Sequence, residues 1–317
     1  MLSFLLLFGL LFSFIFYWKI KARSLPPGPT RLPLIGSFPF LVMKRGLTDW
    51  VLEKSVTRNK ISTISFGPSN YFIINDFALA KELFGKAEFS GRSTKEFMLI
   101  HKNFDGTRHG IINTEGSHWQ KQRRFGLKTL KDFGFGKKSI EELINTELDE
   151  TVEKFLDSNG NDFCLGTDFN IPIINILWQL VTGSRFTEDD NEGQRVIASI
   201  NTMFKSYMKL FFTPYRILKM FPKLTVYEEQ VEIFKIQRNF VLKQIQYHEE
   251  TLDIENPRDF IDVYLIEMAK HKNDKEFTKV DLAVCLLDFL HAGTETTSTT
   301  LKWIVLFLTL HQDVQER

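Results

Sequence analysis

The sequence is poor in net charge and in cysteine, and each scarcity excludes a class of protein. Its 40 lysine and arginine residues nearly balance 39 aspartate and glutamate residues, which leaves a formal net charge of +1. No overall field therefore favours nucleic acid or acidic partners. The two cysteines, Cys164 and Cys285, form neither a CxxC pair nor a disulfide framework. Counting leaves a single disulfide open, but two free thiols in a reducing compartment are the better interpretation.

Apolar residues are abundant instead. Hydrophobic residues make up 43% of the 317-residue chain, which includes 31 phenylalanines. That supply is enough for a large core, in one large domain or two ordinary ones. The rings also suit an apolar ligand pocket, although core packing accounts for most of them.

Residues 1–20 are predicted to form a transmembrane anchor. The uncharged run Leu2–Trp18 spans about 25 Å as a helix, at the short end for a bilayer core. Lys19, Lys21 and Arg23 follow it, so the positive-inside rule places the bulk of the chain in the cytosol. The alternative is a cleaved signal peptide, but the run has no preceding basic region and no small-residue cleavage site.

Residues 21–37 combine this basic stop with a proline-rich hinge. Four prolines in LPPGPTRLPLIG (25–36) prevent helix formation, so the segment is stiff and extended. Such a segment sets the angle between the anchor and the globular body that we assign to 38–317, although an ordinary linker fits the residues equally well.

The body is predicted to be mainly α-helical with a small β element. Two short strands, 61–66 and 71–74, flank a turn, and Asp76 caps a helix that runs through Gly85. Hydrophobic periodicity of about 3.6 residues predicts further helices at 47–58, 116–130, 139–157, 171–183, 189–207, 227–249, 257–271 and 278–310.

The last and longest of these helices has a polar centre, Ala292-Gly293-Thr294-Glu295-Thr296, within an apolar frame. Glycine and threonine are poor choices for a helix interior. Small residues let a flat ligand approach the backbone, and a threonine hydroxyl that bonds to the i−4 carbonyl can open the helix locally. A carboxylate beside that hydroxyl offers a proton path into a dry pocket. The alternative is close helix packing through small residues.

This segment, AGTETTSTT, resembles the oxygen-binding long helix of cytochromes P450. Further segments resemble the microsomal drug- and steroid-metabolising branch of that family, in the family's order: LPPGPTRLPLIG (25–36), FSGR (89–92), HWQKQRRF (118–125) followed by KDFGFGKKSIEE, and NPRDFID (256–262). The order and spacing together make the resemblance specific. It implies an incomplete cytochrome P450 fold behind a transmembrane helix.

The resemblance also implies roles for individual residues. Arg92, Trp119 and Arg123 would contact haem propionates, and the i, i+4 spacing of Trp119 and Arg123 places both on one helix face. Ala292 and Gly293 would lie against haem and substrate. Thr296, with Glu295, would assist proton delivery to dioxygen. Taken alone, Trp119 would be read as a core ring, and Arg123 as a solvated charge.

The implied activity is monooxygenation of an apolar small molecule, with haem as cofactor and electrons from NADPH delivered by NADPH-cytochrome P450 reductase. The implied location is the endoplasmic reticulum membrane, with the catalytic portion cytosolic, and no nucleic acid partner is expected.

One part of the family pattern is absent from this sequence. No Phe-x-x-Gly-x-Arg-x-Cys-x-Gly loop surrounds Cys164 or Cys285, so the iron-ligating cysteine is missing and no metal ligand is assigned. We expect either an incomplete chain of a working enzyme or a truncated, catalytically inactive membrane-bound isoform. Sequencing the transcript past the codon for Arg317 distinguishes the two.

Overall fold

The computed structural model falls into two compact units, one up to Ser90 and one from Gly91 onward. The structure describes residues 18, 23–33, 35–37, 39, 59–67, 69–92, 104–159, 161, 165–166, 168–187, 189–212, 215–271 and 276–317. The predicted anchor, apart from Trp18, and the predicted helix at 47–58 lie outside these residues. Within the described part, no helix is both long enough and apolar enough to cross a membrane.

The first unit contains the predicted β element. Strands β1 (Ile61–Phe66) and β2 (Ser69–Ile74) pair antiparallel from Ile61 opposite Ile74 to Phe66 opposite Ser69. The connection is two residues long and begins at Gly67, whose φ of 55° suits a tight hairpin turn. The first strand is confirmed as predicted, and the second begins two residues earlier than predicted.

The proline-rich segment lies against this hairpin. Pro27 O accepts a hydrogen bond from Thr63 N at 2.7 Å, and Ser37 N donates to Ser65 O at 2.6 Å. Both partners belong to β1, so the segment satisfies backbone groups of that strand which β2 does not reach. Asp76 caps α5 (Phe77–Phe84) as predicted, since its Oδ1 accepts from Leu79 N at 2.8 Å. A 3₁₀ turn, η1 (Ala87–Phe89), follows.

All the regular secondary structure in the described residues of the second unit is helical. Its helices are α7 (Gly116–Asp132), α8 (Ile140–Asp157), α9 (Asn170–Thr182), α10 (Asn191–Phe212), α11 (Tyr215–Met220), α12 (Tyr227–Thr251), α13 (Phe260–Lys270), α14 (Lys279–Leu310) and α15 (Gln312–Gln315). The predicted helices in this region are confirmed, with ends that differ by a few residues. Helix α10 runs five residues further than predicted, and the short α11 and α15 were not predicted.

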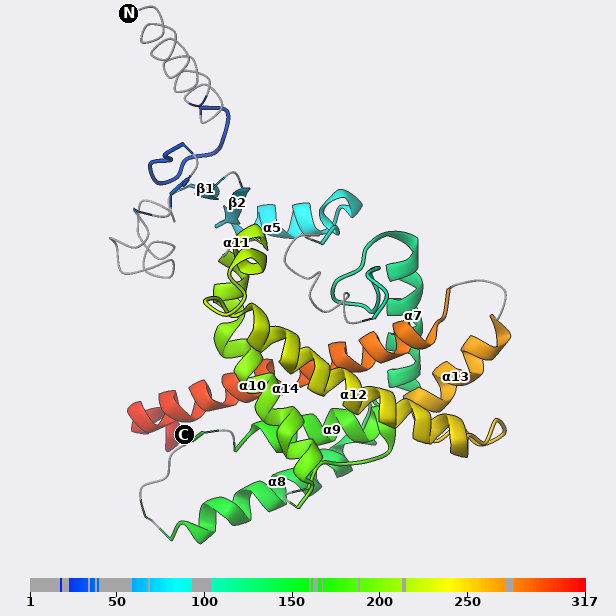
Figure 1. Ribbon diagram of the computed structural model, residues 1–317. Coiled ribbons are helices and arrows are strands. Elements are labelled where there is room, and N and C mark those ends of the chain that lie inside the picture. The colour runs from blue at the N-terminus through cyan, green and yellow to red at the C-terminus, as the bar shows by residue number, and fades with distance from the viewer. Residues whose placement is uncertain are drawn as a thin grey trace, which may run out of the picture. The chain divides into compact units, whose positions relative to one another are not determined.

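Helix α14 is the centre of the second unit. Figure 1 shows it in orange to red, with α9, α10 and α12 packed against it. Every residue from Leu282 to Leu287 is 1% exposed or less, as expected for a helix that is apolar all round. A stacked aromatic group of Trp178, Phe186 and Phe240 belongs to the same core, with ring centroids 5.6–5.7 Å apart.

The second half of α14 differs from the first because its apolar side chains are open to solvent. Trp303 is 55% exposed, Phe307 54% and Leu310 65%. The rings of Trp303 and Phe307 stack on each other with centroids 5.9 Å apart. An exposed apolar surface of this kind is typical of a contact site rather than of ordinary surface.

The loop before α7 is fixed to α14 through a buried carboxylate. Asp288 Oδ2 accepts hydrogen bonds from Ile111 N at 2.6 Å and from Ile112 N at 2.9 Å. Gly110 makes this approach feasible: its φ is +79°, and a Cβ there would lie 2.5 Å from Asp288 Oδ2 and 2.6 Å from Val284 Cγ1. A glycine is therefore required at this position both for its backbone conformation and for space.

We expect Gly110→Ala to destabilise the protein more than Gly106→Ala does. Gly106 has a φ of +80° but no atom within 4 Å of an added Cβ, so it isolates the backbone cost of about 1 kcal/mol. Gly110→Ala adds an overpacking cost of about 1–3 kcal/mol against Asp288 and Val284. Urea unfolding of both variants measures the difference. Equal losses of stability would contradict the close packing of Gly110 against Asp288 and Val284.

The charge state of Asp288 makes a second prediction. Burial raises the pKa of Asp288 to about 7, although its bonds from Ile112 and Ile111 act in the opposite direction. An unfolded aspartate has a pKa of about 3.9, so between about pH 4 and pH 7 the folded state retains a proton that the unfolded state has lost. The stability that Asp288 contributes is therefore full below pH 4 and is lost as the pH rises through 7.

Asp288→Asn keeps a neutral acceptor for Ile111 and Ile112 and removes this titration. Stability measured by urea unfolding should fall less for the variant than for the unaltered chain between pH 4 and pH 7. Parallel stability profiles for the two proteins would show that Asp288 is already ionised in the folded state at pH 4.

Candidate functional site

The polar centre of α14 is continuous helix, and four hydroxyl groups in and just after it lie in two stripes. Four hydroxyls donate to the carbonyl four residues earlier: Thr294 to Leu290 at 2.5 Å, Thr296 to Ala292 at 2.8 Å, Ser298 to Thr294 at 2.6 Å and Thr300 to Thr296 at 2.8 Å. Thr294 and Ser298 are fully buried, whereas Thr296 and Thr300 are exposed. Bonds of this kind explain how the helix tolerates so many hydroxyl side chains.

Ala292 and Thr296 lie on the exposed side of α14. Their spacing of four residues puts them on one face, which continues through Thr300 to Trp303 and Phe307. Because the Ala292 side chain is a single methyl group, little of this face projects beyond the backbone beside the Thr296 hydroxyl. The face therefore combines the small Ala292 side chain with exposed hydroxyls and, further along the helix, with exposed rings.

Gly293 faces a different direction from Ala292. A Cβ on Gly293 would lie 2.7 Å from Leu177 Cδ2 of α9. Its missing side chain therefore allows α9 to pack closely on α14, which is the alternative that the sequence left open for small residues. A role for Gly293 toward a ligand stays a prediction.

Glu295 lies between the two stripes. It is half-buried, and its Oε1 accepts a hydrogen bond from Thr299 Oγ1 at 3.1 Å. Its carboxylate is thus held along the helix by a side chain one turn later, next in sequence to Thr296.

A buried histidine that the sequence analysis missed holds this part of α14 in place. Burial lowers the pKa of His291 to about 4, so the ring is neutral at physiological pH. Its Nε2 lies 2.8 Å from Gln237 Oε1 on α12, and Gln237 Nε2 donates to Ser199 Oγ on α10 at 3.0 Å. Because Gln237 Oε1 can only accept, His291 carries its proton on Nε2. The pair fixes the residue directly before Ala292.

Helix α7 carries the second group of predicted site residues. Trp119 is half-buried and Arg123 is exposed, with the Arg123 guanidinium carbon 5.7 Å from the centre of the Trp119 ring. This distance is within the range of a cation–π contact. The structure thus brings the two residues together on one face, as their spacing predicts.

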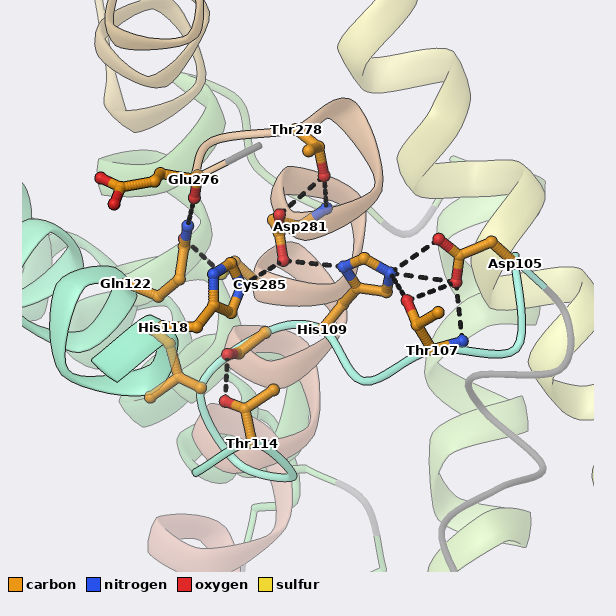
Figure 2. A network of polar contacts seen from close by, with 12 residues as sticks. Asp105, Thr107, His109, Thr114, His118, Gln122, Glu276, Thr278, Asp281 and Cys285 are labelled. Carbon is orange, nitrogen blue, oxygen red and sulfur yellow. Dashed lines mark hydrogen bonds and ion pairs between the residues drawn. The ribbon is translucent and has the colours of Figure 1, made fainter. Parts of the chain in front are cut away.

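A neighbouring face of α7 is tied to the core by Gln122, which is 1% exposed. Its Nε2 donates to Glu276 O at 2.6 Å, and its Oε1 accepts from Tyr264 Oη at 2.9 Å. Cys285 Sγ lies 3.9 Å from the same oxygen, so Gln122 joins α7 to α13 and α14. Figure 2 shows Gln122 beside Glu276 and Cys285. These contacts hold the helix that presents Trp119 and Arg123.

Arg92 reaches the start of α7 through its backbone. Arg92 N donates to Glu115 Oε2 at 2.9 Å, and Glu115 is the residue directly before α7. Arg108 bridges the two, since it donates to Arg92 O at 3.0 Å and pairs with Glu115 at 3.2 Å. The structure therefore places Arg92 near the end of α7 that bears Trp119.

Cys285 does not fit the role of an iron ligand. It is 1% exposed, and burial raises the pKa of its thiol well above the ordinary value, so the thiolate needed for ligation is disfavoured. Cys164 lies outside the described residues.

Comparison with known proteins gives a consistent result. A family profile described as cytochrome P450 matches residues 26–317. The chain is 35% identical to cytochrome P450 2C1 of Oryctolagus cuniculus over 94% of its own length and 61% of that protein. It is 32% identical to cytochrome P450 2J3 of Rattus norvegicus over 100% of its length and 64% of that protein. It is 33% identical to cytochrome P450 2H2 of Gallus gallus, over 92% and 59%. The chain thus spans about three fifths of the length of these relatives.

Proposed function

The chain belongs to the cytochrome P450 family, and from this premise we propose that it supplies part of a haem-dependent monooxygenase that acts on an apolar small molecule. The observation that carries the proposal is the exposed face of α14, where the small Ala292 side chain and the Thr296 hydroxyl follow directly on the buried first half of the helix.

The residues present fit two sides of a haem site. Arg123 and Arg92 supply the cations that haem propionates require, and Trp119 supplies a ring beside Arg123. Ala292 leaves room on α14 for a flat macrocycle. Haem, when bound, supplies the iron redox chemistry that activates dioxygen for insertion of one oxygen atom into a substrate.

The third side, the iron ligand, is not supplied by Cys285, because that thiol is enclosed beneath α7. We propose that a thiolate from a further segment of the protein completes the site. Electrons come from NADPH through a reductase, and the run Leu2–Trp18 anchors the protein in the endoplasmic reticulum membrane.

Thr296 and Glu295 are proposed to move protons at this face. The Thr296 hydroxyl donates to Ala292 O at 2.8 Å and keeps its oxygen lone pairs available to a donor above the helix. Glu295 is the adjacent carboxylate, and it is partly open to water. A proton can thus pass from solvent to Glu295 and then to the position above Thr296.

Thr296→Ala is expected to lower substrate oxidation by at least about tenfold in the haem-loaded enzyme, because it removes the hydroxyl beside the proton path. Thr300→Ala is the matched control, since Thr300 is also exposed and makes the same bond to the carbonyl four residues earlier, at 2.8 Å. Product formation with a reductase and NADPH is the measurement. Equal effects of the two substitutions would contradict the role of Thr296.

Arg123→Ala is expected to lower the amount of haem retained per chain after gel filtration several-fold, because it removes a propionate partner. Arg124→Ala controls for loss of charge, since Arg124 is a neighbouring exposed arginine on another face of α7. Absorbance of the haem relative to protein reports retention without any need for turnover. Haem retention that is unchanged in Arg123→Ala would remove α7 from the proposed site.

A further inference from the structure

Two histidines from different segments converge on one buried carboxylate at the start of α14 (Figure 2). His109 Nδ1 lies 2.8 Å from Asp281 Oδ1, and His118 Nε2 lies 2.9 Å from the same oxygen. His109 comes from the loop before α7, and His118 from the first turn of α7. The three side chains offer ligand atoms that all lie within 4.8 Å of one another.

A further carboxylate orients the outer side of His109. Asp105 approaches His109 Nε2 with both oxygens at 3.0 Å, and Thr107 Oγ1 lies 2.6 Å from the same nitrogen. A neutral imidazole has one N–H, so it can donate to Asp105 or to Asp281 but not to both. When the N–H points at Asp105, the Nδ1 lone pair points at Asp281, and a cation between them resolves the repulsion.

The Asp281 carboxylate is equally well oriented. Its Oδ2 accepts from Thr278 Oγ1 at 2.7 Å, and Asp281 N donates back to Thr278 Oγ1 at 3.0 Å, which fixes the carboxylate at the first turn of α14. Oδ1 is left to face the two histidines. A carboxylate that holds a histidine by its far nitrogen, as Asp105 does, is the usual support of a metal-bound imidazole.

The cluster has one closed and one open side. The Asp281 side chain is 1% exposed and that of His109 11%, whereas His118 is 33% exposed and Asp105 46%. A metal ion therefore has a path from solvent past His118 and Asp105, and water can reach its remaining coordination position.

We propose that His109 Nδ1, His118 Nε2 and Asp281 Oδ1 bind a divalent transition metal, zinc foremost. Two imidazoles and one carboxylate with an open fourth position form a recurrent zinc ligand set. Zinc bonds of about 2.0–2.1 Å place tetrahedral ligand atoms roughly 3.3 Å apart, so each histidine nitrogen needs to move only a few tenths of an ångström away from Asp281 Oδ1. The ion would bind the loop before α7, α7 and α14 together, independently of haem.

A second group of histidine and carboxylate side chains, His248 with Asp259 and Asp262, shows what excludes a metal. Arg258 already pairs with both oxygens of Asp262, at 2.7 and 2.9 Å. His248 and Asp259 side chains are each 2% exposed, so the group is also closed to solvent. The group at Asp281 differs in two ways among the described residues: its ion pairs are with aspartate and histidine alone, and it has an open side.

The test is zinc binding to the purified full chain, carrying an affinity tag that contains no histidine. Competition with a fluorescent zinc chelator gives the stoichiometry and the Kd, and Co²⁺ added alone reports tetrahedral histidine coordination by its visible absorption. We expect one zinc per chain, and a rise in Tm on zinc addition because only the folded chain assembles the site.

His118→Gln is the decisive variant, since His118 is partly exposed and its loss leaves the Asp281 cap intact. It should weaken zinc binding at least about tenfold and abolish the Co²⁺ bands, and Asp105→Asn should weaken binding by about 10–100-fold. His271→Gln is the matched control: its side chain is also 33% exposed and its Nε2 lies 3.2 Å from Glu267 Oε1. It should leave zinc affinity unchanged.

Two results would overturn the proposal. One is the absence of zinc binding to a chain whose circular dichroism shows it to be folded, which means that protons alone join the histidines to Asp281. The other is an equal loss of affinity in His118→Gln and His271→Gln, which places any bound zinc elsewhere on the surface.

Discussion

The arrangement of the second unit depends on the burial of polar side chains along α14. A helix satisfies its own backbone, so it can run through a core, but each polar side chain that it carries there needs a partner. Asp288 finds backbone N–H groups of the loop before α7, and His291 finds Gln237 of α12. Each partner is thereby fixed in position along α14. An apolar helix of the same length would slide and rotate more freely among its neighbours than one joined to them at set points.

Buried polar contacts of this kind also explain how the candidate site is built. The buried contacts of Gln122 and His291 lie on the faces turned toward the core, and Arg123 and Thr296 lie on faces left open. The chemistry that we assign to the open faces therefore depends on side chains that contribute no chemistry of their own.

Much of this could be predicted from the sequence, and the part that could not has a common cause. Local signals gave β1, the Asp76 cap, the long helix and the shared face of Trp119 and Arg123, because each depends on residues close together in the chain. The contacts of Asp288, His109 and His118 join residues more than 160 positions apart, and no periodicity carries that information. Gly293 illustrates the limit: its small size was recognised, but only packing reveals that Leu177 of α9 occupies the space.

The hydrogen bond that the Thr296 hydroxyl makes within α14 determines which kind of ligand group it can bind. A threonine hydroxyl has one hydrogen, and at Thr296 that hydrogen is committed to the Ala292 carbonyl. Toward the open face the side chain is therefore an acceptor and nothing else, until it rotates and gives up the bond to its own helix. A ligand above Thr296 that donates a hydrogen bond can bind without breaking the bond from Thr296 to Ala292 O. A ligand that can only accept requires that bond to break first. The helix thus favours hydrogen-bond donors over acceptors at this position, through the bond between Thr296 and the carbonyl four residues earlier.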